Sequence, residues 1–166
     1  CIHNGWAGVE GLSWIPGKVG AWAMEKIGAY GVEIKDVFYS LEAFHIPEKK
    51  MVNFTLNDCG FGYRESIFKK KFKDQFVITD VIFRLNKIPV YNITYGAIGQ
   101  ELGKMGVKEL SIKAISQAVI NIRSSKLPDP AVIGNAGSFF KNPEIQNSKF
   151  KSLKEQYSNI VGYDLP

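Results

Sequence analysis

The sequence contains very little cysteine and histidine. Its 166 residues include two of each, Cys1 and Cys59, and His3 and His45. Two cysteines in a chain of this length provide neither a disulfide framework nor a zinc-ligand cluster with the usual spacing. We therefore expect two reduced thiols, no metal site, and histidines that lie at the surface rather than act as ligands.

Long hydrophobic runs are also absent. No apolar stretch approaches the roughly 20 residues of a membrane-spanning helix, and the first residues lack the basic and apolar regions of a secretory signal. The sequence begins without methionine and ends after Tyr163 with no helix or strand pattern. We therefore expect a cytoplasmic protein with no membrane partner, and we expect both termini to be cuts through a longer protein.

Catalytic and nucleotide-binding motifs that recur in many enzyme families are missing as well. The sequence has no phosphate-binding Walker loop, no strand followed by Gly-x-Gly-x-x-Gly, no zinc spacing and no Gly-x-Ser-x-Gly elbow. A net charge of +5 favours an anionic partner without selecting one. The densest basic run, Lys69–Lys73, contains Phe72 and is compatible with a nucleic-acid patch. We favour the alternative, lysines that keep a loop or strand edge solvated, and expect no nucleic-acid partner.

The elements that are present predict an α+β fold. β-Branched and aromatic runs predict strands at Val32–Ile46, Lys50–Leu56 and Phe76–Leu85, the last well buried, with a hairpin turn at Ile46–Lys50. Another strand is predicted over Ile88–Thr94. Because strands and helices do not alternate regularly, we expect a mostly antiparallel sheet with flanking helices rather than a doubly wound sheet.

The clearest predicted helix is Ser111–Ser124. Ser111 is a good N-cap, and an apolar stripe follows at helical spacing through Ile112, Ile115, Val119 and Ile122. A short helix is expected over Val19–Ile27, ended by Gly28, and a weaker one over Asn147–Tyr157. Asn57 or Asp58 is a further plausible helix cap within a segment rich in turn residues.

Three loops display polar groups among small residues and are the candidate ligand sites. Glycine lets a backbone approach a ligand closely and leaves amides free to donate. An arginine beside such a loop can hold a carboxylate or phosphate in a bidentate fork. The three loops span residues 15–31, 60–66 and 134–143.

Six motifs in these and neighbouring segments resemble the UDP-N-acetylenolpyruvylglucosamine reductase family, in the same order along the chain. They are Ile15-Pro-Gly17, Ile27-Gly-Ala-Tyr-Gly31, Gly62-Tyr-Arg-Glu-Ser66, Thr94-Tyr-Gly96, Arg123-Ser-Ser-Lys-Leu-Pro-Asp-Pro130 and Gly134-Asn-Ala-Gly-Ser-Phe-Phe-Lys-Asn-Pro143. The resemblance covers the whole chain but only about half of such an enzyme. It implies a partial FAD-binding domain over residues 1–127, including a substrate-loop insert at 89–110, and the beginning of a substrate-binding domain over 128–166.

The resemblance implies an oxidoreductase of peptidoglycan precursor synthesis. This family uses FAD, reduced by NADPH, to convert UDP-N-acetylglucosamine enolpyruvate to UDP-N-acetylmuramate. Such an enzyme needs a cation for the enolate-like intermediate and an acid to protonate it. Arg64 matches the family's carboxylate-stabilising arginine, and Ser138 matches its proton-donating serine. A third catalytic group, a glutamate near the family's carboxy terminus, has no match in this chain, so we expect the 166 residues alone to be inactive.

The resemblance also implies binding residues. Tyr95 matches a tyrosine of a mobile substrate loop that is followed by a helix-like insert, and Lys126 and Asn142 match contacts to the nucleotide sugar. The positions expected to line the flavin are Ile15, Pro16, Gly17, Gly28, Tyr30, Gly31, Arg123 and Gly137. We expect the parent protein to be a monomer and the isolated chain to be able to self-associate.

The chain departs from the family pattern immediately before Ile27. Many relatives carry Pro-hydrophobic-Gln-Asn there, whereas this chain has Ala23-Met-Glu-Lys26, preceded by Trp22. The resemblance therefore predicts no particular flavin contact from this segment. Two alternatives to the reductase remain at this point, a basic nucleic-acid-binding module and a non-enzymatic flavin or UDP-sugar-binding relic.

Overall fold

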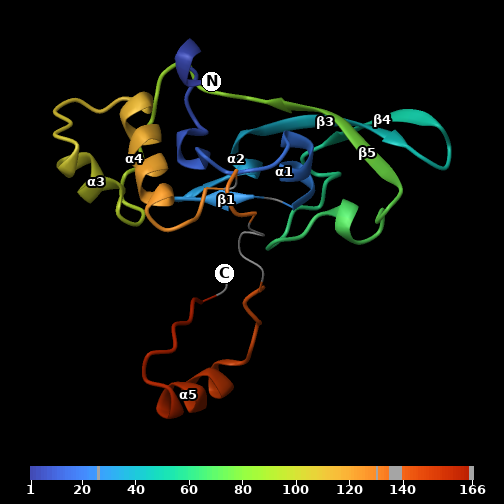
Figure 1. Cartoon of the computed structure of the whole chain (residues 1–166). Coiled ribbons are helices and arrows are strands. Elements are labelled where there is room, and N and C mark those ends of the chain that lie inside the picture. Colours follow the sequence, from blue (N-terminus) through green and yellow to red (C-terminus); the bar gives the residue numbers. More distant parts are fainter. Residues whose placement is uncertain (26, 130, 135–139, 165–166) are drawn as a thin grey trace. The chain divides into compact units, whose positions relative to one another are not determined.

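The computed structural model describes residues 1–25, 27–129, 131–134 and 140–164. The chain divides into two compact units, Cys1–Asn135 and Ala136–Pro166. Each is described here by itself (Figure 1). The predicted functional boundary between residues 127 and 128 stays a prediction.

A three-stranded antiparallel sheet forms one half of the first unit. Its order is β4-β3-β5, with β3 (Phe38–His45) between β4 (Lys50–Thr55) and β5 (Phe76–Phe83). The predicted hairpin is confirmed, because residues 46–49 turn the chain from β3 into β4, with His45 opposite Lys50. Figure 1 shows the hairpin extending away from the helices. An antiparallel sheet with helices beside it confirms the α+β prediction.

The prediction of a well-buried strand at Phe76–Leu85 is wrong. In β5, Val77 is 52% exposed and Ile82 is 54% exposed. The strand pairs with β3 alone and lies at an edge of the sheet, so one of its faces is left outside the core. The buried cluster beneath the sheet is formed mainly by β3 and β4 with the segment that follows them.

The single strand predicted over Val32–Ile46 is also wrong, because a helical turn interrupts it. β2 (Val32–Glu33) pairs with β1 (Gly28–Ala29), and α2 (Ile34–Val37) separates β2 from β3. Glu33 and Asp36 form a reciprocal capping box at the start of α2, in which the Glu33 amide donates to the Asp36 carboxylate over 2.9 Å. This local pairing favours a turn of helix over continued extension.

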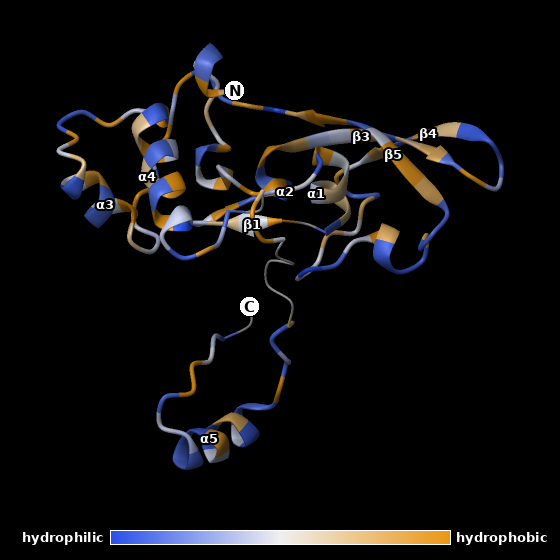
Figure 2. Ribbon diagram, in the orientation of Figure 1, coloured by the Kyte–Doolittle hydropathy of each residue, from blue (hydrophilic) through white to orange (hydrophobic). Residues whose placement is uncertain are grey.

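The strongest helix prediction is confirmed. Helix α4 spans Ile112–Ser124, and the Ser111 hydroxyl accepts a hydrogen bond of 3.1 Å from the Ala114 amide. All four residues of its predicted apolar stripe are buried. Figure 2 shows that α4 carries both hydrophobic and hydrophilic residues. Helix α3 (Ile98–Lys104) packs beside it through Ile98 and Leu102. Helix α1 covers Val19–Glu25, slightly less than predicted.

Two weaker local predictions are wrong. Residues 88–94 form no strand; Pro89 cannot donate to a ladder, and Ile88 and Val90 are 83% and 80% exposed. Neither Asn57 nor Asp58 caps a helix. The segment turns instead, and the Asp58 carboxylate accepts hydrogen bonds from the Thr55 amide and hydroxyl over 2.8 and 2.6 Å.

Short 3-10 helices complete the first unit, η1 (Ile2–Asn4), η2 (Glu10–Leu12) and η3 (Ile67–Lys69). In the second unit, α5 spans Asn147–Gln156 and confirms the predicted helix there. No helix among the described residues has the length and apolar character needed to cross a bilayer.

Candidate functional site

The loop Ile15–Gly17 lies beside the end of α4. Arg123, in the last turn of α4, donates a hydrogen bond of 3.1 Å from Nε to the carbonyl oxygen of Trp14. Ile15 packs against the same buried cluster as Ala29 of β1. Loop 15–17, the β1 strand and Arg123, predicted as flavin-lining from separate motifs, therefore belong to one region.

The turn between β1 and β2 is a tight hairpin. Tyr30 and Gly31 both adopt the left-handed conformation, with φ of 50° and 76°, and the Ala29–Val32 pair closes the turn. Positive φ at both central residues is the geometry that favours glycine, and here glycine occupies the second position. Gly28 pairs with Glu33 at the other end of this short ladder.

This turn contacts the segment predicted to bind substrate. The rings of Tyr30 and Tyr95 meet edge to face, with centroids 6.4 Å apart and planes at 83°. A Cβ atom on Gly31 would lie 3.5 Å from Cβ of Tyr95. Tyr95 itself is 58% exposed. The structure thus places a predicted flavin-side residue directly against a predicted substrate-side residue.

Trp22 supplies a polar atom suited to a cofactor region. Its indole Nε1 is buried and has no hydrogen-bond partner among the described residues. A Cβ atom built on Gly17, whose φ is 110°, would lie 3.7 Å from this nitrogen. A buried donor without an acceptor is costly, and most buried donors in native proteins bond to a protein group or an ordered molecule. The region around loop 15–17 therefore fits a ligand that carries acceptor atoms.

Arg64 occupies a tight turn of its own. Gly62 and Glu65 close the turn through two backbone hydrogen bonds of 3.0 and 3.3 Å. Arg64 has a φ of 52°, a conformation that costs a residue with a Cβ about 1 kcal/mol or more. The Lys69 ammonium donates a hydrogen bond of 3.0 Å to the Arg64 carbonyl oxygen. These contacts fix the backbone of Arg64, and with it the direction in which the side chain leaves the turn.

A buried serine follows this turn. Ser66 is 1% exposed, and its hydroxyl donates a hydrogen bond of 2.5 Å to the carbonyl oxygen of Met24 in α1. Nearby, Cys59 is fully buried, and burial raises the pKa of its thiol to about 12. The thiol is therefore protonated at neutral pH and does not serve as a nucleophile.

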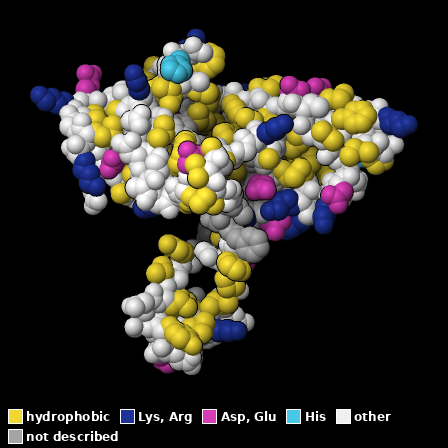
Figure 3. Space-filling view, viewed as in Figure 1, with side chains coloured by type: hydrophobic (Ala, Val, Ile, Leu, Met, Phe, Trp, Pro, Cys, Tyr) yellow, Lys and Arg dark blue, Asp and Glu magenta, His cyan; other side chains and the backbone are white. Residues whose placement is uncertain are grey.

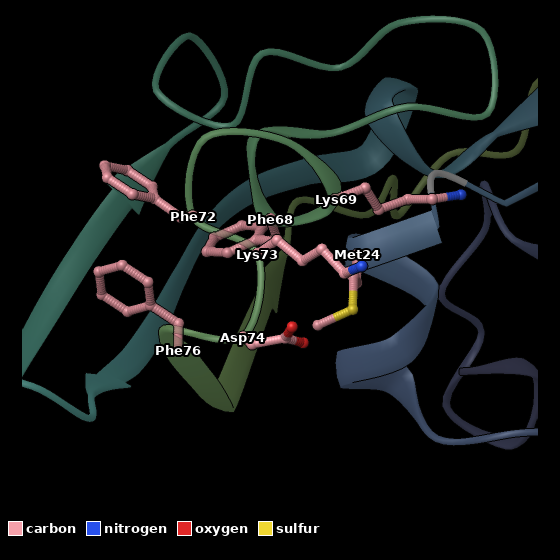
Figure 4. A pocket seen from close by; sticks show the side chains of 7 residues that line it. All are labelled: Met24, Phe68, Lys69, Phe72, Lys73, Asp74 and Phe76. Atoms are coloured by element: carbon pink, nitrogen blue, oxygen red, sulfur yellow. The ribbon is translucent and has the colours of Figure 1, made fainter.

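An open cavity of about 360 Å³ lies between α1 and the segment after Ser66. Figure 4 shows Met24 of α1 pointing toward Lys73 and Asp74 of the loop. The cavity is lined by Met24, Phe68, Lys69, Phe72, Lys73, Asp74 and Phe76.

The run Lys69–Lys73 does not form a set of uniformly free cations. Lys69 binds the Arg64 carbonyl, Lys70 lies 3.7 Å from the Glu65 carboxylate, and Lys71 lies over the Phe72 ring at 5.2 Å. Figure 3 shows one face of the first unit, on which charged side chains are scattered among hydrophobic ones.

No group of three or more potential metal ligands occurs within the described ranges.

The remaining predicted residues fall into three groups. Lys126 is exposed just beyond α4, where its amide bonds to the Arg123 carbonyl. Asn142 is exposed in the second unit, which is described by itself. Gly137 and Ser138 lie outside the described residues.

Sequence reasoning missed the contacts that position these residues. Ser66 ends the Gly62–Ser66 motif and Trp14 precedes the Ile15 motif, yet neither was singled out. The available signal was a serine two residues after a predicted catalytic arginine, within the same motif. The Trp14 carbonyl had none, because backbone acceptors carry no sequence pattern.

Comparison with known proteins gives one consistent result. The chain is 54% identical over 160 residues to UDP-N-acetylenolpyruvoylglucosamine reductase of Amoebophilus asiaticus, covering 96% of this chain and 47% of that protein. It is 47% identical over 165 residues to the same-named protein of Flavobacterium johnsoniae, covering 99% of this chain and 49% of that protein. The chain thus spans about half the length of these curated relatives. No family model matches it.

A solved structure is also similar. The crystal structure of UDP-N-acetylenolpyruvylglucosamine reductase (MurB) from Thermus caldophilus matches with a TM-score of 0.59 and 25% sequence identity. The match covers 86% of this chain and 42% of that one.

Proposed function

Because the chain is a homologue of UDP-N-acetylenolpyruvoylglucosamine reductases over nearly its whole length, we propose that it forms the central part of such an enzyme. The proposed reaction is the FAD-dependent, NADPH-linked reduction of UDP-N-acetylglucosamine enolpyruvate to UDP-N-acetylmuramate, a step of peptidoglycan precursor synthesis. We place the protein in the cytoplasm, as a monomer with no nucleic-acid partner.

The contact between Tyr30 and Tyr95 carries this proposal. Two residues from separate motifs, Tyr30 predicted for the flavin side and Tyr95 for the substrate side, meet edge to face within one unit. A hydride donor and its acceptor must lie within contact distance, so an enzyme of this class needs its two binding regions to adjoin. A protein that bound only a flavin, or only a UDP-sugar, would not need this juxtaposition.

The residues proposed to hold FAD fit such a ligand. Loop 15–17 and the β1–β2 turn offer backbone groups beside glycines with positive φ, and Trp22 offers a buried indole donor. Arg123 is proposed to hold the loop while presenting a cation to an anionic cofactor. When bound, FAD supplies the hydride chemistry of the reaction. Gly137 completes the proposed set.

Arg64 is proposed to stabilise the negative charge that develops on the substrate's carboxylate after hydride addition. Its turn fixes the backbone from which the side chain extends, which reduces the reorganisation needed as charge develops. Ser138 is proposed to give the proton to the carbon next to that carboxylate. Serine is a weak acid. In this proposal Arg64 stabilises the charge formed by hydride addition, and Ser138 performs the separate step of proton transfer.

Tyr95, Lys126 and Asn142 are the proposed contacts to the UDP-sugar. Tyr95 is largely exposed and therefore available to a ligand. Lys126 provides an ammonium suited to a diphosphate, and Asn142 provides an amide for hydrogen bonding.

The full-length protein tests this proposal directly. We expect it to be yellow as purified and to oxidise NADPH when the enolpyruvyl substrate is added. A colourless protein that stays inactive after FAD is supplied would contradict the proposal. The isolated 166 residues are expected to show no turnover and weak FAD binding.

A further inference from the structure

We propose that Ser66 is a positioning residue that sets the place of Arg64 relative to the flavin side of the site. The inference rests on the proposed function and adds to it a residue with no assigned role. Ser66 is 1% exposed, and its hydroxyl donates to the Met24 carbonyl, 42 positions earlier in the chain. Ser66 thereby joins the segment of Arg64 to helix α1.

The two ends of this hydrogen bond lie close to the two proposed halves of the reaction. Ser66 is two residues after Arg64, at the exit of the Gly62–Glu65 turn. Met24 is near the end of α1, which leads through Ile27 into β1 and the proposed flavin-side turn. A shift of this bond would change the separation between the guanidinium and the flavin-side residues.

Apolar packing alone fixes this separation poorly. Ala23, Met24 and Phe68 pack in one cluster, but such contacts are non-directional and permit small slides. The cavity between α1 and the loop leaves part of this boundary without filling side chains (Figure 4). A buried, directional hydrogen bond at its edge is the contact that resists sliding.

Local contacts hold the Arg64 turn but do not connect it to α1. The two Gly62–Glu65 bonds and the Lys69 bond to the Arg64 carbonyl all lie within residues 62–69. They define the shape of the turn. The Ile67 amide ties the following residue to the Cys59 carbonyl over 2.9 Å, and the Ser66 hydroxyl is the group that bonds this segment to α1. A displacement of about 1 Å in a catalytic group can lower a rate about a hundredfold, so placement is functionally significant.

A double-mutant cycle in the full-length holoenzyme tests the inference. Single-turnover kinetics would follow flavin reduction by NADPH and flavin reoxidation by the enolpyruvyl substrate, in wild type, Ser66→Ala, Arg64→Ala and the double variant. We expect Ser66→Ala to slow reoxidation about tenfold and to leave reduction within about twofold. In the Arg64→Ala background, Ser66→Ala should slow reoxidation by less than about twofold, because the group it positions is gone.

Ser116→Ala is the matched control. Ser116 is also buried, and its hydroxyl lies 2.7 Å from the hydroxyl of Ser13, so this contact joins α4 to the segment after η2 and does not involve the Gly62–Ser66 motif. Its effect on reoxidation should be the same in the presence and absence of Arg64. If Ser66→Ala does not fold, Ser66→Cys keeps most of the volume, weakens the donor and serves in the same cycle.

The outcomes separate the two proposals. Equal effects of Ser66→Ala with and without Arg64, or equal slowing of both half-reactions, would overturn the positioning role and leave the proposed function intact. If Arg64→Ala left reoxidation unchanged, the proposed role of Arg64 would fail, and the role of Ser66 with it.

Discussion

The Nε atom of Arg123 donates a hydrogen bond of 3.1 Å to the carbonyl oxygen of Trp14, which lies 109 positions earlier in the chain. The bond joins the last turn of α4 to the entrance of loop 15–17. One side chain therefore holds the loop proposed to line the flavin and contributes a permanent cation beside it.

Arg123→Lys should weaken FAD binding. Lysine keeps the charge but has no Nε–H, so loop 15–17 loses its tether and its placement. Because this bond is exposed to solvent, we take the lower end of the about 1.5–3 kcal/mol that a hydrogen bond from a charged group contributes. That corresponds to roughly a 10-fold increase in the Kd for FAD. Fluorescence titration of apoprotein with FAD would measure it.

Arg84→Lys is the control for this experiment. Arg84 lies over the ring of Tyr39 at 4.5 Å, just beyond β5, and takes no part in the proposed flavin site. Its replacement should leave the Kd for FAD unchanged. Equal Kd values for wild type and Arg123→Lys would show that Arg123 does not act on the flavin side.

Hydrogen bonds between residues distant in the sequence, such as that from Arg123 to Trp14, could not be predicted from the sequence. Helix α4 was predictable because its information is local, in the Ser111 cap and the apolar stripe at helical spacing. The interruption at α2 was missed because Glu33 and Asp36, which form its capping box, stand within a run typical of a strand. The exposure of β5 was unpredictable from its own residues, since it depends on which strands pair with it.

The candidate site shows the same division. The six motifs predicted site roles for Arg64, Tyr30 and Tyr95. In the structure the rings of Tyr30 and Tyr95 are in contact. The bonds from Ser66 to Met24 and from Arg123 to Trp14 join a side chain to a distant backbone carbonyl. Every residue has that carbonyl, so only the fold reveals which one is used.

Gly31→Ala should destabilise the protein and raise the KM for the UDP-sugar. Gly31 has a φ of 76°, and an added Cβ would lie 3.4 Å from Nδ2 of Asn92 and 3.5 Å from Cβ of Tyr95. These are ordinary contact distances, so the loss of stability comes from left-handed strain of about 1–2 kcal/mol. A shift of the turn that relieves this strain would move residue 31 against Tyr95, which it already contacts, and would so raise the KM. Urea unfolding and steady-state kinetics would measure the two effects.

Gly60→Ala separates strain from contact. Gly60 also has a positive φ, of 54°, and an added Cβ there meets nothing within 4 Å. It should lower the free energy of unfolding through strain alone and leave the KM unchanged. If Gly31→Ala behaved like Gly60→Ala in both measurements, the contact with Tyr95 would have no functional weight.

Cys59 should resist thiol reagents in the folded protein. Burial raises the pKa of its thiol to about 12, and its side chain is fully enclosed, so the reactive thiolate is scarce and inaccessible at pH 8. Labelling with a maleimide, followed by peptide mass spectrometry, should modify exposed Cys1 quickly and Cys59 only after denaturant is added. Rapid labelling of Cys59 without denaturant would contradict the packing around it.

Asp58→Asn should reduce stability at neutral pH and weaken its dependence on acid. Hydrogen bonds from the Thr55 hydroxyl and amide lower the pKa of the Asp58 carboxyl in the folded state. The stabilisation is therefore present above the ordinary carboxyl pKa and is lost as the pH falls through the lowered value. Urea midpoints at pH 7 and pH 3 should differ less in Asp58→Asn than in wild type. An unchanged difference would mean that other groups govern the acid response.

Arg64→Gly should separate stability from activity. Arg64 adopts a φ of 52°, which glycine accepts without strain, so relief of strain should offset the lost side-chain contacts and keep the free energy of unfolding within about 1 kcal/mol of wild type. Reoxidation of the flavin by the enolpyruvyl substrate should nevertheless slow at least about a hundredfold, because the group proposed to stabilise the developing charge is lost. Lys49→Gly provides the matched control, since Lys49 has a φ of 51° in the exposed β3–β4 hairpin. Its free energy of unfolding should stay at the wild-type value or rise by up to about 1 kcal/mol, and it should keep full turnover. A large loss of stability in Arg64→Gly would instead make Arg64 a structural residue of its turn.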